Sequence, residues 1–184
     1  MLVVVGYFFK SPFRLIRQYD QEHPESPVGP YGEIDFYTFQ KILHAFSIPT
    51  EWSICELGSG RGRLGFWLVM VHGQNKVVCI ERHPMMAARA ARVQNHFAIP
   101  NLEFVCGDWQ EEDLSSYDLI YLYALSEDDL TPLAEPLARL KKGTHIITIG
   151  WWLGEYLPDR FFLKNKSPCS FEWGKSFAYL QKVL

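Results

Sequence analysis

Short apolar runs alternate with helix-like segments from Glu33 to the end of the chain. The runs that read as strands are 52–57, 76–80, 102–106, 117–123, 144–149, 160–164 and 176–182. Between them, apolar residues recur every three or four positions, which is the spacing of one helix face, as at Phe36, Phe39, Leu43 and Phe46. Strands that alternate with helices need right-handed crossovers and give a mostly parallel sheet. The pattern therefore predicts an α/β fold.

Three of the expected helices carry further signals. The segment 64–71 is apolar nearly all round, so we expect a helix that is buried on most sides. The segment 86–97 shows one apolar face. A third helix is expected to begin at 126–129, where Ser126 precedes an acidic residue by three positions. Pro132 and Pro136 must interrupt or kink it.

Length and charge narrow the class of protein. The chain has 184 residues, which a single α/β domain commonly uses in full. Lysine and arginine total 18 against 21 acidic residues, which gives a net charge of -3. Nucleic-acid binders usually carry a clear basic excess, so the balance argues against a nucleic-acid partner. The four cysteines form no CxxC pair, which favours buried free thiols in a reducing, cytoplasmic setting.

Residues 1–32 are expected to form an N-terminal lead-in or lid, and residues 33–184 the main domain. The apolar run 2–9 is much shorter than the roughly 20 residues that a membrane span needs. It lacks the positive start of a signal peptide. Weak membrane contact through this segment is one interpretation, and core packing or a flexible lead-in is the other.

Acidic residues follow three successive predicted strands. Glu56 stands at the end of the first, directly before the loop Gly58, Ser59, Gly60, Arg61 and Gly62. Glu81, followed by Arg82, ends the second strand, and Asp108 with Trp109 follows the third. Ligands of such sheets bind at the carboxyl ends of the strands. The glycines let the backbone turn sharply beside a ligand, Glu81 can accept both hydroxyls of a ribose, and Asp108 with Trp109 suits an adenine ring.

Two nucleoside cofactors fit this frame. Residues 60–65 formally match the GxGxxG pattern of dinucleotide binding, which would make the protein an NAD(P)-dependent oxidoreductase. However, Glu56 beside the loop suits a cationic ammonium group better than a pyrophosphate, and Asp108 is not part of that pattern. S-adenosyl-L-methionine, with its ammonium and sulfonium groups, fits better.

The run 56–62, with Glu81 and the pair 107–108, resembles the first motifs of class I S-adenosylmethionine-dependent methyltransferases. The run 140–143 is similar to a turn that this family carries before its fifth strand. The resemblance covers about residues 33–184. It implies a Rossmann-like three-layer sandwich with seven strands, the last antiparallel. It also implies cofactor contacts from a set of residues at the strand ends: Glu56, Gly58, Ser59, Gly60, Gly62, Glu81, Arg82, Asp108, Trp109 and Tyr123.

A narrower resemblance concerns the acceptor. The glycine run, the pair 108–109 and the aromatic-rich last strands are similar to small lysine methyltransferases that act on ATP-synthase c-subunits and adenine-nucleotide translocases. The lead-in Tyr31-Gly32-Glu33 resembles that of non-SET histone lysine methyltransferases. Tyr31 and Glu33 are accordingly candidates for substrate binding. Trp151 and Trp152 are further candidates, because they directly follow the fifth expected strand. Two features depart from known patterns: residues 121–125 lack the asparagine-proline-proline-tyrosine motif of amide and adenine methyltransferases, and the membrane span of the mitochondrial relatives is missing.

The sequence does not identify the methyl acceptor. A protein lysine leads, a small metabolite follows and RNA comes third. No general base can be named, the histidines share no metal-ligand spacing, and the oligomeric state is undetermined. We expect Glu81 to face a cleft and to have no part in packing.

Overall fold

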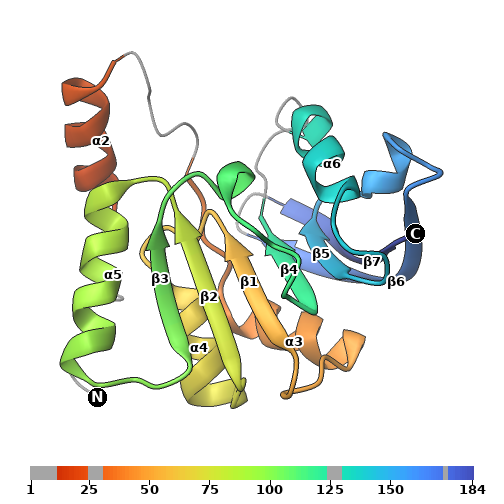
Figure 1. Cartoon of the computed structure of the whole chain (residues 1–184), viewed down its shortest axis with the longest axis horizontal. Helices are drawn as coiled ribbons and strands as arrows, with labels where there is room; N and C mark the ends of the chain where they lie inside the picture. Colours follow the sequence, from red (N-terminus) through yellow and green to blue (C-terminus); the bar gives the residue numbers. More distant parts are fainter. Residues whose placement is uncertain (1–11, 25–30, 124–129, 172–173) are drawn as a thin grey trace.

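The computed structural model describes residues 12–24, 31–123, 130–171 and 174–184. Seven strands form one sheet in the order β3-β2-β1-β4-β5-β7-β6 (Figure 1). They are β1 (Ser53–Leu57), β2 (Lys76–Glu81), β3 (Leu102–Cys106), β4 (Leu119–Leu122), β5 (His145–Ile149), β6 (Phe161–Phe171) and β7 (Gly174–Val183). β1 to β5 pair in parallel, and β7 runs antiparallel to both β5 and β6. The expected seven-stranded Rossmann-like sheet is confirmed.

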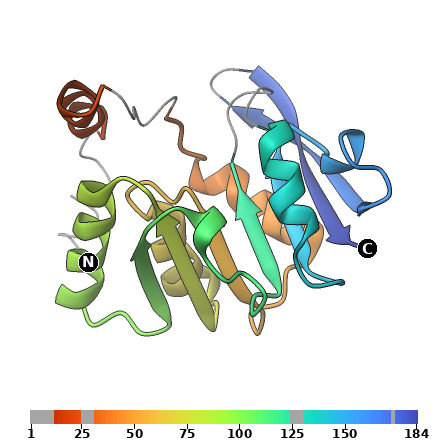
Figure 2. The same cartoon turned by 45° about the horizontal axis from the view of Figure 1, so that its top comes forward.

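Helices cover both faces of the sheet and make it the middle of three layers. α3 (Phe36–Phe46), α4 (Arg63–Trp67) and α5 (Pro84–His96) lie on one face, and α6 (Leu130–Ala138) lies on the other (Figure 1). The lead-in helix α2 (Phe13–Glu22) stands apart from the sheet, above the start of α5 (Figure 2). Short helical turns complete the fold: η1 (Leu68–His72), η2 (Trp109–Glu111) and η3 (Leu153–Glu155).

The strand alternation sorts the core into two clusters. Along β1, Ile54 packs with α3 and α4, whereas Cys55 and Leu57 pack with α6 on the opposite face. Successive side chains of a strand point to opposite faces, so a central strand must be apolar on both. Glu56 lies two residues after Ile54, on the same face of the strand, and therefore points into the layer of α3 and α4. This orientation decides the surroundings of its carboxyl group.

The expectation of a helix buried on most sides over 64–71 is only partly right. Leu64, Phe66 and Leu68 are buried, but Met70 is 49% and Val71 66% exposed. The α-helix ends at Trp67 and continues as the π-helical turn η1. The wider turn changes the angle between successive side chains, so the last apolar residues rotate away from the core.

The last two strands are longer than the expected 160–164 and 176–182. β5 pairs with β7 only as far as Ile149 and Ala178, whereas β6 and β7 stay paired up to Phe171 and Gly174. Their hairpin thus extends past the carboxyl end of β5. Pro168 did not stop β6, because an edge strand tolerates a residue without an N–H group.

Several expectations fall outside the described residues: the apolar run 2–9, residues 25–30 of the lead-in and the helix start at 126–129. Within the described ranges, no helix is long and apolar enough to cross a membrane. Cys55, Cys79 and Cys169 are buried, as expected for free thiols, but Cys106 at the end of β3 is exposed.

Candidate cofactor and acceptor site

The loop between β1 and α4 bends through three glycines with left-handed backbone angles. Gly58, Gly60 and Gly62 have φ values of 69°, 56° and 71°. Only glycine adopts such angles without steric cost. The N–H groups of Gly58 and Ser59 donate to the carbonyl oxygen of Ile80 at 2.9 and 3.0 Å. The loop is therefore fixed to the end of β2.

The glycines differ in what surrounds them. A Cβ at Gly62 would lie 2.2 Å from the Phe104 ring, and one at Gly65 would lie 2.3 Å from Sγ of Cys79. A Cβ at Gly58 would meet nothing within 4 Å. Gly62 and Gly65 are thus required for packing, whereas Gly58 borders open space at the carboxyl edge of the sheet.

Glu81 is bonded to the loop as well as to the next helix. Its Oε2 accepts from the Gly60 N–H at 2.6 Å, and its Oε1 accepts from the His83 N–H at 2.7 Å. The side chain is buried. The expectation that Glu81 has no structural part is therefore wrong. Its two oxygens retain lone pairs for further donors, because a carboxylate offers about four acceptor positions.

Replacement of Glu81 by alanine is expected to affect stability and cofactor affinity together. Two buried N–H groups lose their acceptor, which costs about 1–3 kcal/mol each when nothing replaces it. Affinity for S-adenosylmethionine should fall by about tenfold to several hundredfold if the carboxylate also binds the ribose. Urea unfolding and titration calorimetry measure the two effects. Glu103→Ala, which removes an exposed acid on β3, is the control. A dissociation constant within twofold of the parent would place the ribose elsewhere.

The end of β3 presents Asp108 and Trp109. Asp108 precedes η2, and its carboxylate accepts from the Gln110 N–H at 3.0 Å. Trp109 is partly buried against the cluster beneath α6. The two residues stand beside the end of β2, since β3 pairs with β2 up to Glu81 and Cys106. Arg82 follows Glu81 and is exposed.

Glu56 lies beneath the glycine loop. Its Oε2 accepts from Sγ of Cys79 at 3.3 Å, and the carboxyl group also accepts from the Gly65 N–H. Burial raises the pKa of this carboxyl from its ordinary 4.5 to about 8, although both hydrogen bonds oppose the rise. Glu56 was expected to face the ammonium group of the cofactor. In the structure its carboxyl group has the start of α4 as a partner and supports the loop from inside, and the contact with the ammonium group stays a prediction.

This buried carboxyl predicts a stability that falls as pH rises. The pKa of Glu56 is higher in the folded than in the unfolded protein, so the folded state binds the proton more tightly. The stabilisation that this proton provides is lost as pH rises from the unfolded pKa to the folded pKa. The linkage amounts to about 2 kcal/mol between pH 6 and pH 8. Glu56→Gln keeps a neutral side chain and should remove this component. Urea unfolding at both pH values measures this component. If the unfolding free energy changes equally with pH in parent and variant, Glu56 is ionised throughout.

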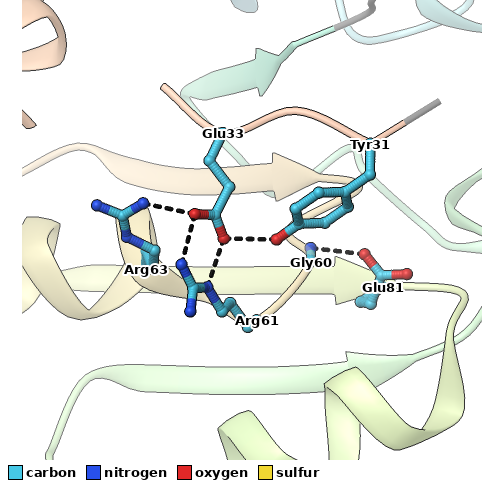
Figure 3. Close-up of polar contacts among 6 residues, drawn as sticks. All are labelled: Tyr31, Glu33, Gly60, Arg61, Arg63 and Glu81. Atoms are coloured by element: carbon cyan, nitrogen blue, oxygen red, sulfur yellow. Dashed lines mark hydrogen bonds and ion pairs between the residues drawn. The ribbon is translucent and has the colours of Figure 1, made fainter. Parts of the chain in front are cut away.

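The segment before α3 is joined to the glycine loop by a group of four residues, which we call the clasp: Tyr31, Glu33, Arg61 and Arg63 (Figure 3). Glu33 accepts from the Tyr31 hydroxyl and from Nε of Arg61, each at 2.5 Å. Its second oxygen accepts from Nη2 of Arg61 at 2.7 Å and from Nη1 of Arg63 at 2.5 Å. A Cβ at Gly60 would lie 2.9 Å from the Tyr31 ring. The lead-in thus covers the turn of the loop.

Charge in the clasp is partly balanced. Burial opposes ionisation of Glu33, but the hydrogen bonds from Arg61, Tyr31 and Arg63 outweigh it and lower the pKa of the carboxyl. Burial, reinforced by the charge of Glu33, raises the pKa of the Tyr31 hydroxyl, which stays protonated. One carboxylate thus serves two guanidinium groups. The sequence placed Tyr31 and Glu33 among the site candidates, but it assigned no role to either arginine.

The lead-in helix reaches the same region through aromatic contacts. The Tyr19 ring lies 4.4 Å from the buried His83 ring, between centroids, and the Phe13 ring lies 6.0 Å from that of Tyr31. α2 is thus attached beside the end of β2, where a ribose is expected. This position is consistent with the proposed lid.

Tyr31 and Glu33 belong to the clasp, whereas the other two acceptor candidates, Trp151 and Trp152, follow β5, next to the end of β4. Tyr123 follows β4, and its ring stacks on that of Phe171 at 6.0 Å with an interplanar angle of 19°. Phe171 comes from the β6–β7 hairpin and was missed from the sequence, because nothing local shows that the hairpin extends past β5. Trp151 is partly buried against the α6 cluster. A Cβ at Gly154 would lie 2.5 Å from the Trp152 ring.

A cofactor with an adenosine and a cationic amino-acid end fits these residues. Open space borders Gly58, and the buried Ser59 Oγ has no partner among the described residues. Glu81 offers acceptor capacity for a ribose, and Asp108 stands beside it on the neighbouring strand end. These features agree with a nucleoside that lies across β1, β2 and β3.

Comparison with known proteins finds similarity to methyltransferases. Residues 54–143 match the family model of a methyltransferase domain. A protein-L-isoaspartate O-methyltransferase of Methanococcus aeolicus is 29% identical over 129 residues, which is 68% of this chain and 57% of that protein. The chain therefore spans little more than half the length of this curated relative.

Solved structures share the fold. An RNA methyltransferase of Salinibacter ruber, in complex with S-adenosyl-L-homocysteine, superposes with a TM-score of 0.67 at 21% identity over 83% of this chain and 94% of that one. A tRNA methyltransferase of B. subtilis superposes with a TM-score of 0.66 at 15% identity, over 82% of this chain and 66% of that one. A mitomycin 7-O-methyltransferase superposes with a TM-score of 0.65 at 14% identity, over 80% of this chain and 53% of that one. Residues 54–143 thus resemble a methyltransferase domain in sequence, and the chain shares the fold of solved methyltransferases. Both likenesses favour a methyltransferase over the dinucleotide alternative.

Proposed function

We propose that this protein transfers a methyl group to the side-chain amine of a protein lysine. The observation that carries the proposal is the combination of an aromatic wall with an acidic loop at the carboxyl edge of the sheet. The wall consists of Tyr123 and Phe171. The loop after β3 carries Asp108, Glu111, Glu112 and Asp113.

The charges at this edge favour a cationic acceptor. Arg61 and Arg63 share the carboxylate of Glu33 in the clasp, which leaves one net positive charge there against the four acids after β3. Complementary charge steers a basic protein toward the site and disfavours the phosphates of an RNA. The curated relative named above is itself a methyltransferase of protein residues, which agrees with a protein acceptor.

The aromatic wall suits an amine on an aliphatic stem. Tyr123 and Phe171 offer ring faces along which the methylenes of a lysine can pack. A cationic amine is attracted to such faces, and desolvation beside them lowers its pKa and favours the neutral nucleophile. Bound S-adenosylmethionine supplies an electrophilic methyl group on sulfur. The protein's part is to align the amine and exclude water.

Methyl transfer from labelled S-adenosylmethionine tests the proposal. The acceptors are a basic peptide with one lysine, the same peptide with arginine in its place, a set of small amines and a tRNA. We expect label only in the lysine peptide, and Phe171→Ala should raise its KM without changing cofactor affinity. Labelling of the small amines alone would favour a metabolite acceptor, and labelling of the tRNA would overturn the assignment to protein.

A further inference from the structure

Basic side chains converge at the amino edge of the sheet, opposite the candidate site. His145 begins β5, and its cross-strand partner on β7 is Lys182. On β6, Lys164 places its Nζ 3.4 Å from Nε2 of His145. Directly opposed residues of antiparallel strands share one face of the sheet. His145 and Lys182 therefore point to the same side, and so does Phe162, which is opposite Lys182 on β6.

The imidazole is held in place before any ligand arrives. The Trp52 ring stacks on it with centroids 4.4 Å apart and planes inclined by 25°. The backbone N–H of His145 donates to the carbonyl oxygen of Asp118 at 3.0 Å. A histidine with a fixed ring and a half-buried position can bind a partner at low entropic cost.

The charges around His145 are mainly positive. Lys164 approaches it from β6 and Lys182 from β7, while Asp118 lies ahead of β4 and binds Ser53 through Oδ2. Burial and the two lysines lower the pKa of His145, and Asp118 opposes them. Among the residues that the structure describes, neither lysine forms an ion pair with a carboxylate. Converging cations without such a partner attract an anion.

We propose that His145, Lys164 and Lys182 form a binding site for a phosphate-type oxyanion. An oxyanion between them would accept charge-assisted hydrogen bonds from two ammonium groups and an imidazolium. Free phosphate and a phospholipid headgroup present the same chemistry. Phe162, which is 57% exposed, gives the site an apolar rim that a lipid would also contact.

Proton NMR titration of the histidines tests this site in the intact protein. In inorganic phosphate, compared with chloride at equal ionic strength, the pKa of His145 should rise, because the bound anion favours the imidazolium form. The protein has six histidines, so the others serve as internal references. Lys164→Gln and Lys182→Gln should each weaken phosphate binding by about tenfold. Lys175→Gln, at the far end of β7, should leave it unchanged.

Vesicle binding distinguishes the two sources of the oxyanion. Binding to vesicles that contain phosphatidic acid, but not to pure phosphatidylcholine, would identify a headgroup if Lys164→Gln and Phe162→Ser both abolish it. A response to inorganic phosphate without vesicle binding would identify a free phosphate compound. If His145 titrates identically in phosphate and chloride and the vesicles stay unbound, there is no oxyanion site.

Discussion

Gly62→Ala is expected to destabilise the protein by about 2–5 kcal/mol. A left-handed backbone angle costs an alanine about 1–2 kcal/mol, and Gly62 has a φ of 71°. The new Cβ would also lie 2.2 Å from the Phe104 ring and 3.3 Å from Cβ of Ala90. Forcing such a contact apart costs typically about 1–3 kcal/mol more. Urea unfolding measures the loss.

Gly58→Ala is the matched control, because it carries nearly the same φ of 69° without a neighbour within 4 Å. Its free energy of unfolding should fall only by the backbone cost of about 1–2 kcal/mol. Its affinity for S-adenosylmethionine should nevertheless fall more than about tenfold, because the methyl group enters the space assigned to the ligand. Equal unfolding free energies for the two variants would contradict the packing role of Gly62. Unchanged affinity in Gly58→Ala would move the ligand away from this loop.

A second substitution checks the cause of the Gly62 effect. Phe104→Leu shortens the side chain that the new Cβ meets, so the double variant should be more stable than the sum of the two single effects predicts. Residues in contact commonly show coupling energies of about 0.5–3 kcal/mol. Strict additivity would show that Phe104 is not the group that Gly62 must avoid.

The sheet was predictable because its signal is local. Each central strand is a short apolar run, and the order of runs and helices leaves few topologies. The exposure of the apolar residues in η1 was not predictable in the same way. Met70 and Val71 continue an apolar pattern, and only the π-helical turn sends them outward.

The positions of the site acids were also predictable, but their partners were not. Strand ends locate Glu81 and Asp108, yet no sequence rule shows that the Glu81 carboxylate binds the N–H of Gly60. For Glu56 a signal existed. Its parity with Ile54 in a central strand places it in the helix layer and not at the open edge.

The clasp depends on contacts that sequence spacing does not show. Glu33 is 28 residues from Arg61, and the chain between them forms a helix and a strand. Their pairing arises because the segment before α3 crosses the glycine loop. Tyr31 and Glu33 could be named from a resemblance, whereas their arrangement around Arg61 and Arg63 required the structure.

Glu33→Ala is expected to lower stability by about 2–4 kcal/mol and to weaken cofactor binding. Removal of one partner of a buried pair leaves an uncompensated charge, which costs about 3–5 kcal/mol when burial is complete. Arg61 is 9% exposed and Arg63 is partly buried, so the cost here should be somewhat smaller. Tyr31 also loses its acceptor, and its ring should no longer stay over Gly60.

The pH dependence of this loss has a definite sign. The pKa of Glu33 is lowered in the folded state, so its stabilisation is present above the ordinary value of 4.5 and disappears as pH falls through the folded value. The parent protein should therefore lose more stability than Glu33→Ala on acidification below this ordinary value. Glu135→Ala is the control, since its pair with Arg139 spans 3.9 Å between exposed side chains and contributes about 0–1 kcal/mol. If both variants lose equally little, the clasp does not hold the lead-in on the glycine loop. If Glu33→Ala is destabilised but binds the cofactor normally, the clasp supports the fold and does not shape the ligand site.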